Sequence, residues 1–433
     1  MEHFKRDIDC VNTYGNMTLQ KFANKYLYYL FVFTLLFGIV FYDIIGFNSI
    51  DEICGMLLLI LFARNMFKEK DWPINKFFFT TICVFLFYTV YSFYIGSNTQ
   101  KAIFMDLIIQ MKPYLAFFCI YQMMPQFDEN QKKTLKDLCL VLWCIFLPIG
   151  LYGFLDIRIF NRIMGHPSCY AAIVTALSLT YLYCGNYSKK EKTIFLIMLF
   201  VGIASGRSKF YGFYALSIFM VFYLGKIENL KFDFKNTTAL LLLIAAMAFV
   251  AREKLDLYFV QGLSETESEE KDLLARFVLY ATSFKLLADY VPFGTGLASF
   301  GTHASGVYYS NIYTKYGIDS VWGLSKSFNK FIADTYYPSL AQFGIMGVIL
   351  FFLFWVYIIL KSIRNSQITQ DSKLFTITCL IIGYLLIENI ADASFTSNRG
   401  LFMMMFLGLV AANQKAEAKR IIQTTQIQGI KND

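Results

Sequence analysis

Along most of the chain, long apolar runs alternate with short polar segments. A helix needs about 20 apolar residues to cross the hydrocarbon core of a bilayer. The pattern therefore predicts an all-α fold, a polytopic transmembrane helix bundle of about twelve spans. The predicted spans are residues 26–45, 53–67, 77–96, 102–124, 138–155, 168–185, 193–204, 210–225, 237–250, 338–360, 374–390 and 401–412.

One long polar segment, residues 251–337, interrupts this alternation and is the only one large enough to form structure outside the membrane. It separates nine spans (1–250) from three more (338–413) and a tail (414–433). It begins with an acidic stretch, SETESEEK, to which we assign no function. An apolar stripe at helical spacing follows, and Pro292 ends it, so we expect an amphipathic helix along the outer membrane surface. The stripe is Leu273, Phe277, Tyr280, Phe284 and Leu287.

Composition agrees with a membrane protein, since 57% of the residues are hydrophobic and 16% are charged, against about 25% charged in soluble domains. The net charge of +8 comes from Lys and Arg at the ends of apolar runs, which argues against a nucleic-acid surface. With the N-terminus placed inside, 24 of these cations lie inside and 14 outside, eight of them in the long loop. The positive-inside rule then predicts that both termini are cytoplasmic.

No metal or cofactor motif stands out. The nine cysteines fall mostly inside apolar runs and lack the spacing of a disulfide framework or metal site. The glycine-rich segment FGTGLASFG departs from the G-x-G-x-x-G pattern and follows a predicted helix instead of a strand. We therefore expect a tight turn there and no dinucleotide site.

Ionisable residues collect at the outer ends of the spans, where charge is costly and often functional. Several are arginines, whose planar fork of donors matches phosphate oxygens. A ring of arginines on one face therefore suggests a site for a pyrophosphate or an acidic headgroup. Its candidates are Arg158, Arg162 and His166 before the sixth span, Arg207 and Lys209 in a short turn, Arg276 in the amphipathic helix, Asp334 before the tenth span, and Glu388, Asp392 and Arg399 in the last outside turn.

Structural interpretations stay open for each candidate. Arg207 is equally consistent with snorkelling to headgroups or pairing with a neighbouring helix. For Asp334, a helix cap or a partner for an arginine is favoured over catalysis, and His166 and His303 are expected to cap or pack. Lys112 is expected to line the bundle interior or to reach a headgroup, and it receives no function.

The order of these motifs resembles the bacterial O-antigen polymerase and O-antigen ligase superfamily. In that superfamily an arginine precedes a glycine- and proline-containing span entrance, a short arginine turn follows, and a large periplasmic loop carries an arginine helix and two glycine turns. The matching segments are RIMGHPSCYAA with Arg162, ASGRSKF with Arg207, ARFVLYATSFKLLADYVPFGTG with Arg276, Pro292, Gly294 and Gly296, and ADTYYPSLAQFGIMG with Gly344 and Gly347.

The resemblance implies a metal-independent glycosyltransferase, without cofactor, at the outer face of the bacterial inner membrane. It would polymerise undecaprenyl-pyrophosphate-linked repeat units of O antigen, exopolysaccharide or capsule. The ligases carry a His where this chain has Asp334, which favours polymerisation over ligation to lipid A-core. The implied partners are the lipid-linked donor and acceptor, membrane lipids and a chain-length regulator protein, with no nucleic acid.

Sugar transfer from a lipid pyrophosphate needs cations for the leaving group and a base for the acceptor hydroxyl. We therefore expect Arg207 and Arg276 to hold the pyrophosphate and Asp334 to be the base. Residues expected to bind substrate are Arg158, Arg162, His166, Lys209, Tyr336 and Tyr337. The rival class is a lipid or sugar transporter, whose decisive charges belong near the membrane midplane. A receptor or scaffold ranks third.

Overall fold

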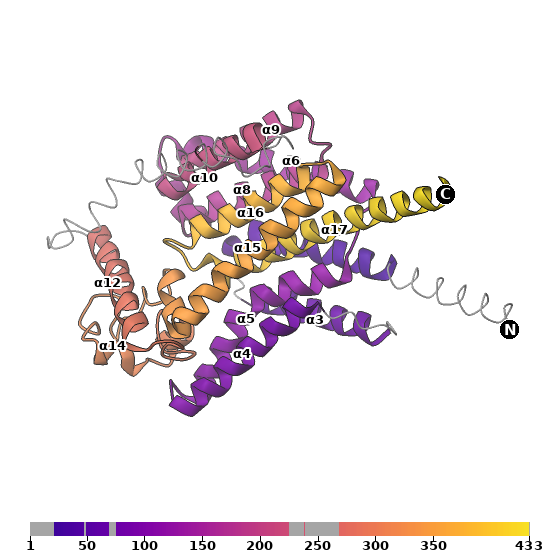
Figure 1. Cartoon of the computed structure of the whole chain (residues 1–433). Helices are drawn as coiled ribbons and strands as arrows, with labels where there is room; N and C mark the ends of the chain where they lie inside the picture. Colours follow the sequence, from indigo (N-terminus) through magenta and orange to yellow (C-terminus); the bar gives the residue numbers. More distant parts are fainter. Residues whose placement is uncertain (1–20, 47–48, 69–74, 225–237, 239–267, 433) are drawn as a thin grey trace, which may run out of the picture.

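The computed structural model describes residues 21–46, 49–68, 75–224, 238 and 268–432, and every regular element in these ranges is helical (Figure 1). The all-α prediction is thus confirmed for the described chain. Eleven of the twelve predicted spans coincide with helical segments, whereas the ninth, residues 237–250, lies outside the described residues apart from Thr238. Six helices are long and apolar enough to cross a membrane: Lys21–Val40, Lys76–Ile95, Gln100–Met123, Glu129–Gly153, Pro167–Cys184 and Tyr337–Thr369.

The helices follow one another through short connections. After the first helix, which ends in a π-turn (η1, Leu36–Val40), the first half contains α2 Tyr42–Ile45, α3 Ile50–Lys68, α4 Lys76–Ile95, α5 Gln100–Met123, α6 Glu129–Gly153, α7 Arg158–Met164, α8 Pro167–Cys184, α9 Lys189–Phe200, η2 Val201–Ser205, α10 Ser208–Phe219 and η3 Met220–Leu224. The second half contains α12 Ser268–Asp289, α13 His303–Val307, α14 Asn311–Lys315, η5 Tyr337–Phe343, α15 Gly344–Thr369, α16 Lys373–Glu388, η6 Ser394–Thr396 and α17 Asn398–Asn432.

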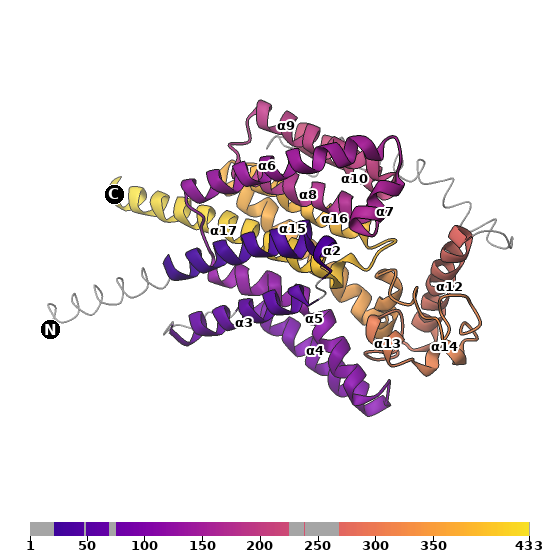
Figure 2. The ribbon, with the colours of Figure 1, turned by 180° about the vertical axis from the view of Figure 1, so that it is seen from behind.

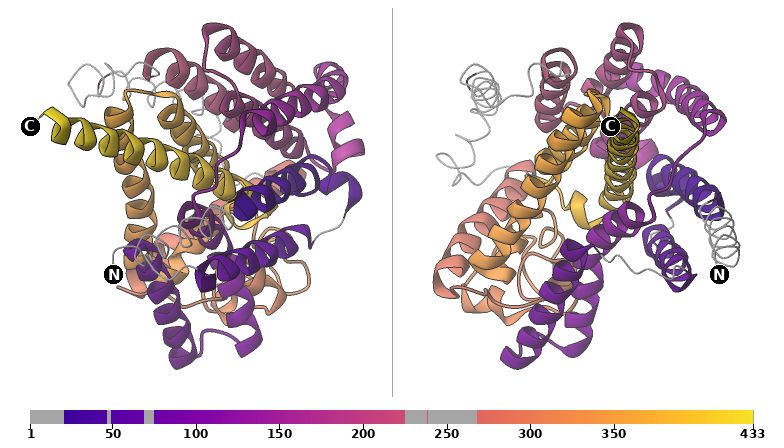
Figure 3. Two further views of the ribbon diagram at one scale, coloured as in Figure 1. Left: turned by 90° about the vertical axis from the view of Figure 1, so that its right-hand side faces the viewer. Right: turned by 45° about the vertical axis from the view of Figure 1, so that its right-hand side comes forward.

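The centre of the bundle is formed by α17, with α5 and α8 packed near it. Figure 3 shows α17 running between the α3–α5 side and the α6–α10 side. All 18 residues of α8 are buried, as expected for a helix surrounded by protein. Where α17 meets α5, a Cβ on Gly408 would lie 2.7 Å from the Phe117 carbonyl oxygen. Glycine therefore permits the close approach of these two helices.

The two ends of the bundle differ in what they carry. The start of the first helix and the end of α17 lie at one end, whereas α12, α13 and α14 lie at the other (Figures 1 and 2). This arrangement agrees with a topology in which both termini face away from the long loop. The assignment of the two ends to cytoplasm and periplasm stays a prediction from the charge distribution.

The structure shows which side of α12 packs against protein. Ala275, Leu279 and Leu286 are fully buried, whereas Phe284, a member of the predicted stripe, is 67% exposed. The buried face packs against protein, in a small core that includes Phe300 and Tyr313 from the same loop. The helix thus packs on protein with one side and leaves Phe284, a member of the predicted stripe, exposed on another, and contact of that stripe with the membrane surface stays a prediction.

The glycine-rich segment forms the predicted turn and docks onto the outer ends of α4 and α5. A Cβ on Gly294 would lie 2.3 Å from the Gly344 nitrogen, so the backbones of the two glycine motifs are in close contact. The Ala298 amide donates to Asp106 Oδ2 at 2.7 Å, and Asn98 Nδ2 donates to the Ala298 carbonyl oxygen at 2.8 Å. These contacts fix the loop, including the segment that leads to Asp334, against the bundle.

Candidate active site

Five elements meet at the loop end of the bundle and bring the predicted residues near one another. They are the start of α8, the start of α10, α12, the segment before η5, and the turn between α16 and α17 (Figure 1). These elements are separated by as many as 230 residues in the chain, as shown by the Arg399 contact with the Cys169 sulfur at 3.2 Å. The tertiary fold therefore brings these segments together at one end of the bundle.

Arg276 and Asp334 form an ion pair. Arg276 Nε donates to Asp334 Oδ2 at 2.5 Å, and the two side chains are 19% and 28% exposed. The pair joins α12 to the segment before η5. A second link, from the Tyr280 hydroxyl to the Ile390 carbonyl oxygen at 2.7 Å, ties α12 to the last outside turn. The alternative that Asp334 is a partner for an arginine is thus realised, and the pair remains accessible to solvent.

Arg207 contacts His166 across the outer end of the bundle. Gly206, with φ of 65°, ends η2 in the left-handed region and leaves Arg207 at the N-cap of α10. The Arg207 guanidinium lies against the imidazole, with Nη2 closest to Nε2 and 3.3 Å from Nδ1. His166 also caps α8, since its Nδ1 accepts from the Ser168 amide at 3.2 Å. The predicted capping role of His166 is confirmed.

The imidazole of His166 is neutral. The Ser168 amide donates to Nδ1, so that ring nitrogen is unprotonated. Partial burial and the positive charge of Arg207 lower the pKa of His166 to about 4. His166 therefore orients Arg207 without adding charge.

Arg207 carries the positive charge that the site leaves uncompensated. Among the described residues, no carboxylate oxygen lies within 4 Å of its guanidinium, in contrast to Arg276 and Arg399. Burial and the neighbouring Arg276 lower the pKa of Arg207, an effect that Glu388 and Asp392 oppose. Two guanidinium groups thus lie close enough to repel each other, which an anion between them would relieve.

Lys209 faces the bundle interior. It pairs closely with Glu388 and lies 3.7 Å from Asp392 Oδ2, which also accepts from Arg399 Nη1 at 2.8 Å. The Lys209 and Glu388 side chains are 13% and 4% exposed. This network joins α10, α16 and α17, so Lys209 positions the site and does not face a substrate directly.

The other predicted substrate-binding residues stand apart from these contacts. Arg158 and Arg162 are exposed on α7, and Arg158 Nε donates to Asp156 at 2.9 Å. Tyr336 is buried, and the Tyr337 hydroxyl donates to the Leu386 carbonyl oxygen at 2.7 Å. We define the outer cluster as the four residues that do converge: His166, Arg207, Arg276 and Asp334.

A polar cavity of about 330 Å³ lies beside the outer cluster. Lys112 is among the residues that line it. The Lys112 ammonium pairs closely with Asp51 and lies 3.4 Å from Glu52 Oε1. The prediction that Lys112 lines the bundle interior is confirmed, but its partners and the cavity were not anticipated. The signal was present, because one lysine in a long apolar run needs a buried partner.

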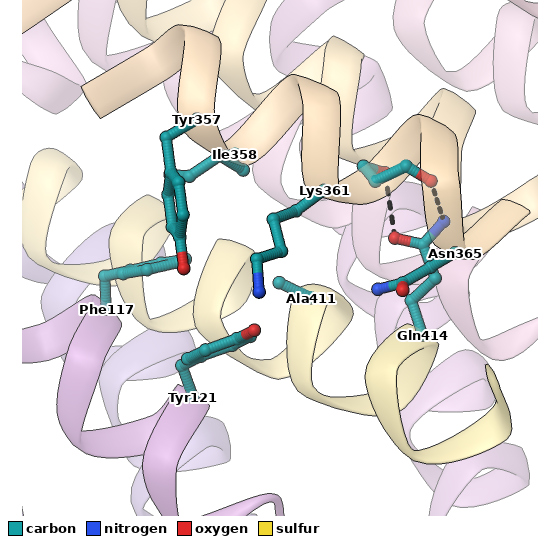
Figure 4. A pocket seen from close by; sticks show the side chains of 9 residues that line it. Phe117, Tyr121, Tyr357, Ile358, Lys361, Asn365, Ala411 and Gln414 are labelled. Carbon is teal, nitrogen blue, oxygen red and sulfur yellow. Dashed lines mark hydrogen bonds between the residues drawn. The ribbon is translucent and has the colours of Figure 1, made fainter. Parts of the chain in front are cut away.

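The opposite end of the bundle is closely packed. Figure 4 shows Lys361 between Tyr121 and Tyr357, beside a space of about 10 Å³, roughly the size of one water. Ser362 and Gln414 exchange two hydrogen bonds, of 2.8 and 2.9 Å, which join α15 to α17. The larger cavity therefore lies on the side of the outer cluster.

Comparison of the sequence with protein-family models and with curated proteins finds no match. In the part of the chain that the structure describes, no group of three or more His, Cys, Asp or Glu side chains is arranged to hold a metal ion. The functional argument therefore rests on the geometry of the outer cluster and on the resemblance of the motifs.

Proposed function

We propose that this protein is a membrane glycosyltransferase that extends a glycan from a lipid-pyrophosphate donor, as a polymerase of undecaprenyl-pyrophosphate-linked repeat units. It would act at the outer face of the bacterial inner membrane. The observation that carries the proposal is that Arg207 and Arg276 lie close enough to repel each other, with the Asp334 carboxylate paired to Arg276. Arg207 lacks a carboxylate within 4 Å among the described residues, so its charge is available to an anion.

The proposed step is a single displacement. The acceptor hydroxyl oxygen forms a bond to the anomeric carbon of the donor sugar, while the bond from that carbon to the pyrophosphate oxygen breaks. The hydroxyl proton passes to Asp334, and undecaprenyl pyrophosphate leaves with the electron pair. Fixed cations aimed at the leaving oxygens stabilise the charge that develops there.

Each member of the outer cluster has a distinct part in this step. Arg207 and Arg276 bind the pyrophosphate oxygens, and neutral His166 orients Arg207. In the structure Asp334 Oδ2 accepts from Arg276, which leaves Oδ1 for the acceptor hydroxyl.

The test uses purified full-length protein in liposomes with defined lipid-linked repeat units. Growth of a ladder of lipid-linked products supports the polymerase. Transfer of the glycan only after lipid A-core is added would indicate a ligase. The absence of glycosyl transfer to either acceptor would refute the proposal.

A transporter of lipid-linked sugars is the second candidate, because Lys112 and Asp51 form a buried ion pair near the middle of α5. Buried charge within a span is typical of transport pathways. The same liposomes separate the two classes, since a transporter moves the lipid-linked sugar across the bilayer without lengthening it.

A further inference from the structure

We propose that the cavity beside the outer cluster binds the terminal sugar of the acceptor glycan. This inference rests on the proposed function and assigns the acceptor a binding site separate from that of the pyrophosphate. The cavity lies between the starts of α2 and α3, the middle of α5, and the segments around residues 301–303, 333–339 and 393–398. Its volume of about 330 Å³ is at the low end of the roughly 300–1,000 Å³ typical of ligand pockets, which suits one or two sugar rings.

The lining has the mixed character that a sugar requires. Gln110, Thr302 and Ser339 carry amide and hydroxyl groups, and two aromatic rings, from Tyr42 and Tyr336, border the same space. Hydroxyls of a sugar need fixed donors and acceptors, while its C–H faces pack on aromatic rings.

Charge in the cavity separates an acceptor sugar from a pyrophosphate. Lys112 provides one positive charge, whereas Asp51 and Glu52 provide two negative ones. Asp51 is 5% exposed, and its Oδ1 atom has no hydrogen-bond donor among the described residues. Such a buried acceptor calls for a donor, which a sugar hydroxyl or amino group supplies. The cavity therefore favours neutral and amino sugars over uronic acids and phosphates.

The cavity lies close to the proposed base along the chain. Ala333 and Tyr336, which line it, flank Asp334 in the chain, and Ala393 lines it next to Asp392. Consecutive Cα atoms lie about 3.8 Å apart, so the Cα of Asp334 lies about that far from the Cα of a lining residue, Ala333. The Glu52 side chain is 51% exposed and marks an open edge of the cavity. A glycan can therefore enter with its terminal hydroxyl towards Asp334.

The experiment measures sugar binding independently of chain growth. Full-length protein in nanodiscs is titrated with N-acetylglucosamine, glucosamine and glucuronic acid, and binding is followed by saturation-transfer NMR. The neutral and amino sugars are expected to bind more tightly than the uronic acid. A Trp at Thr396, which lines the cavity, should abolish binding, whereas Lys101→Ala, an exposed change on the same side, should leave it unchanged.

Glu52→Gln is the variant that preserves the fold, because the side chain is half exposed. One charge about 6 Å from a ligand, at an effective dielectric constant near 40, changes affinity about tenfold. Removal of this charge weakens glucosamine and strengthens glucuronic acid about tenfold each, so the preference for glucosamine over glucuronic acid should fall about 100-fold in Glu52→Gln. An unchanged preference, or binding that survives Thr396→Trp in folded protein, would overturn the inference.

Ladder formation on the same samples separates this inference from the proposed function. Ladders in both the unaltered protein and Thr396→Trp, with the same KM for the acceptor, would overturn the cavity assignment and leave the polymerase standing. Sugar binding that responds to Glu52→Gln, with no glycosyl transfer by any variant, would support a sugar cavity and refute the polymerase.

Discussion

Replacing Arg207 removes the one guanidinium of the outer cluster that is not paired with a carboxylate among the described residues. Arg207→Ala should lower kcat/KM for a lipid-linked donor while leaving the fold intact. The fold should persist because Arg207 contacts His166, which keeps its second bond to the Ser168 amide at 3.2 Å. The substitution therefore removes the positive charge while the fold is expected to stay unchanged.

The magnitude follows from the electrostatics of the site. A guanidinium 4 Å from a phosphate oxygen, at an effective dielectric constant near 20, interacts by about 4 kcal/mol. Loss of one such transition-state contact typically lowers the rate about 100- to 1,000-fold. Arg207→Lys keeps the charge but loses the bidentate fork, and losing a hydrogen bond to a charged group costs about 1.5–3 kcal/mol, or roughly 10- to 100-fold.

The assay is initial-rate ladder formation by purified protein in liposomes, at matched protein amounts. Lys101→Ala is the matched control, since it removes an exposed positive charge from the same side of the molecule and should change the rate less than about twofold. Selective ¹³C-histidine NMR supplies a readout that does not depend on activity. Because the Arg207 charge contributes to lowering the pKa of His166 to about 4, that pKa should rise in Arg207→Ala.

Two results would refute the reasoning. Near-normal rates in Arg207→Ala, with the pKa of His166 raised as expected, would remove Arg207 from the mechanism while confirming its place in the structure. An unchanged pKa of His166 would contradict the contact itself.

Three further predictions concern stability and topology. Lys209→Met should lower the free energy of unfolding by about 3–5 kcal/mol, because it leaves the buried carboxylate of Glu388 without its ion-pair partner. Adding Glu388→Gln should restore part of this loss, as measured by thermal unfolding. The pKa of His166, about 4 in the folded protein, lies below the usual value near 6.5, so its contribution to stability is complete above about pH 6.5 and is lost towards pH 4; the fall in melting temperature between pH 7 and 4.5 should be smaller in His166→Gln than in the unaltered protein. A single cysteine at Ser320 in a cysteine-free background should react with a membrane-impermeant thiol reagent without permeabilisation of the inner membrane, and reaction only afterwards would contradict the outside placement of the loop.

Helices and their order were predictable because each apolar run is long and bounded by charge. The predicted spans that fall within the described residues coincide with helices. The convergence of Arg207, Arg276 and Asp334 follows because alternate loops share one face of the bundle. Partners were harder to predict. Lys209 has the same sequence signature as Arg207, yet it pairs with Glu388, 179 positions away in the chain, and faces inward.

The cavity and the buried face of α12 could not be derived from local sequence. The cavity depends on the separate approach of α3, α5 and the segments around residues 302, 336 and 396, none of which is fixed by periodicity. The buried face of α12 depends on the loop that folds beneath it, which contributes Phe300 and Tyr313 to the small core around Ala275 and Leu279. In both cases the outcome depends on packing between segments that are far apart in the chain.

In the proposed step Asp334 accepts a proton during glycosyl transfer, and the decisive variant is Asp334→Asn. An amide keeps the shape of the side chain but cannot take the proton, and a general base contributes about 100- to 10,000-fold to the rate. The account predicts that Asp334→Asn in liposomes forms no detectable ladder from lipid-linked repeat units, while it still binds the lipid-linked donor and Asp319→Asn, a matched change in the same loop, forms ladders normally. Ladder formation by Asp334→Asn at close to the unaltered rate would contradict the account.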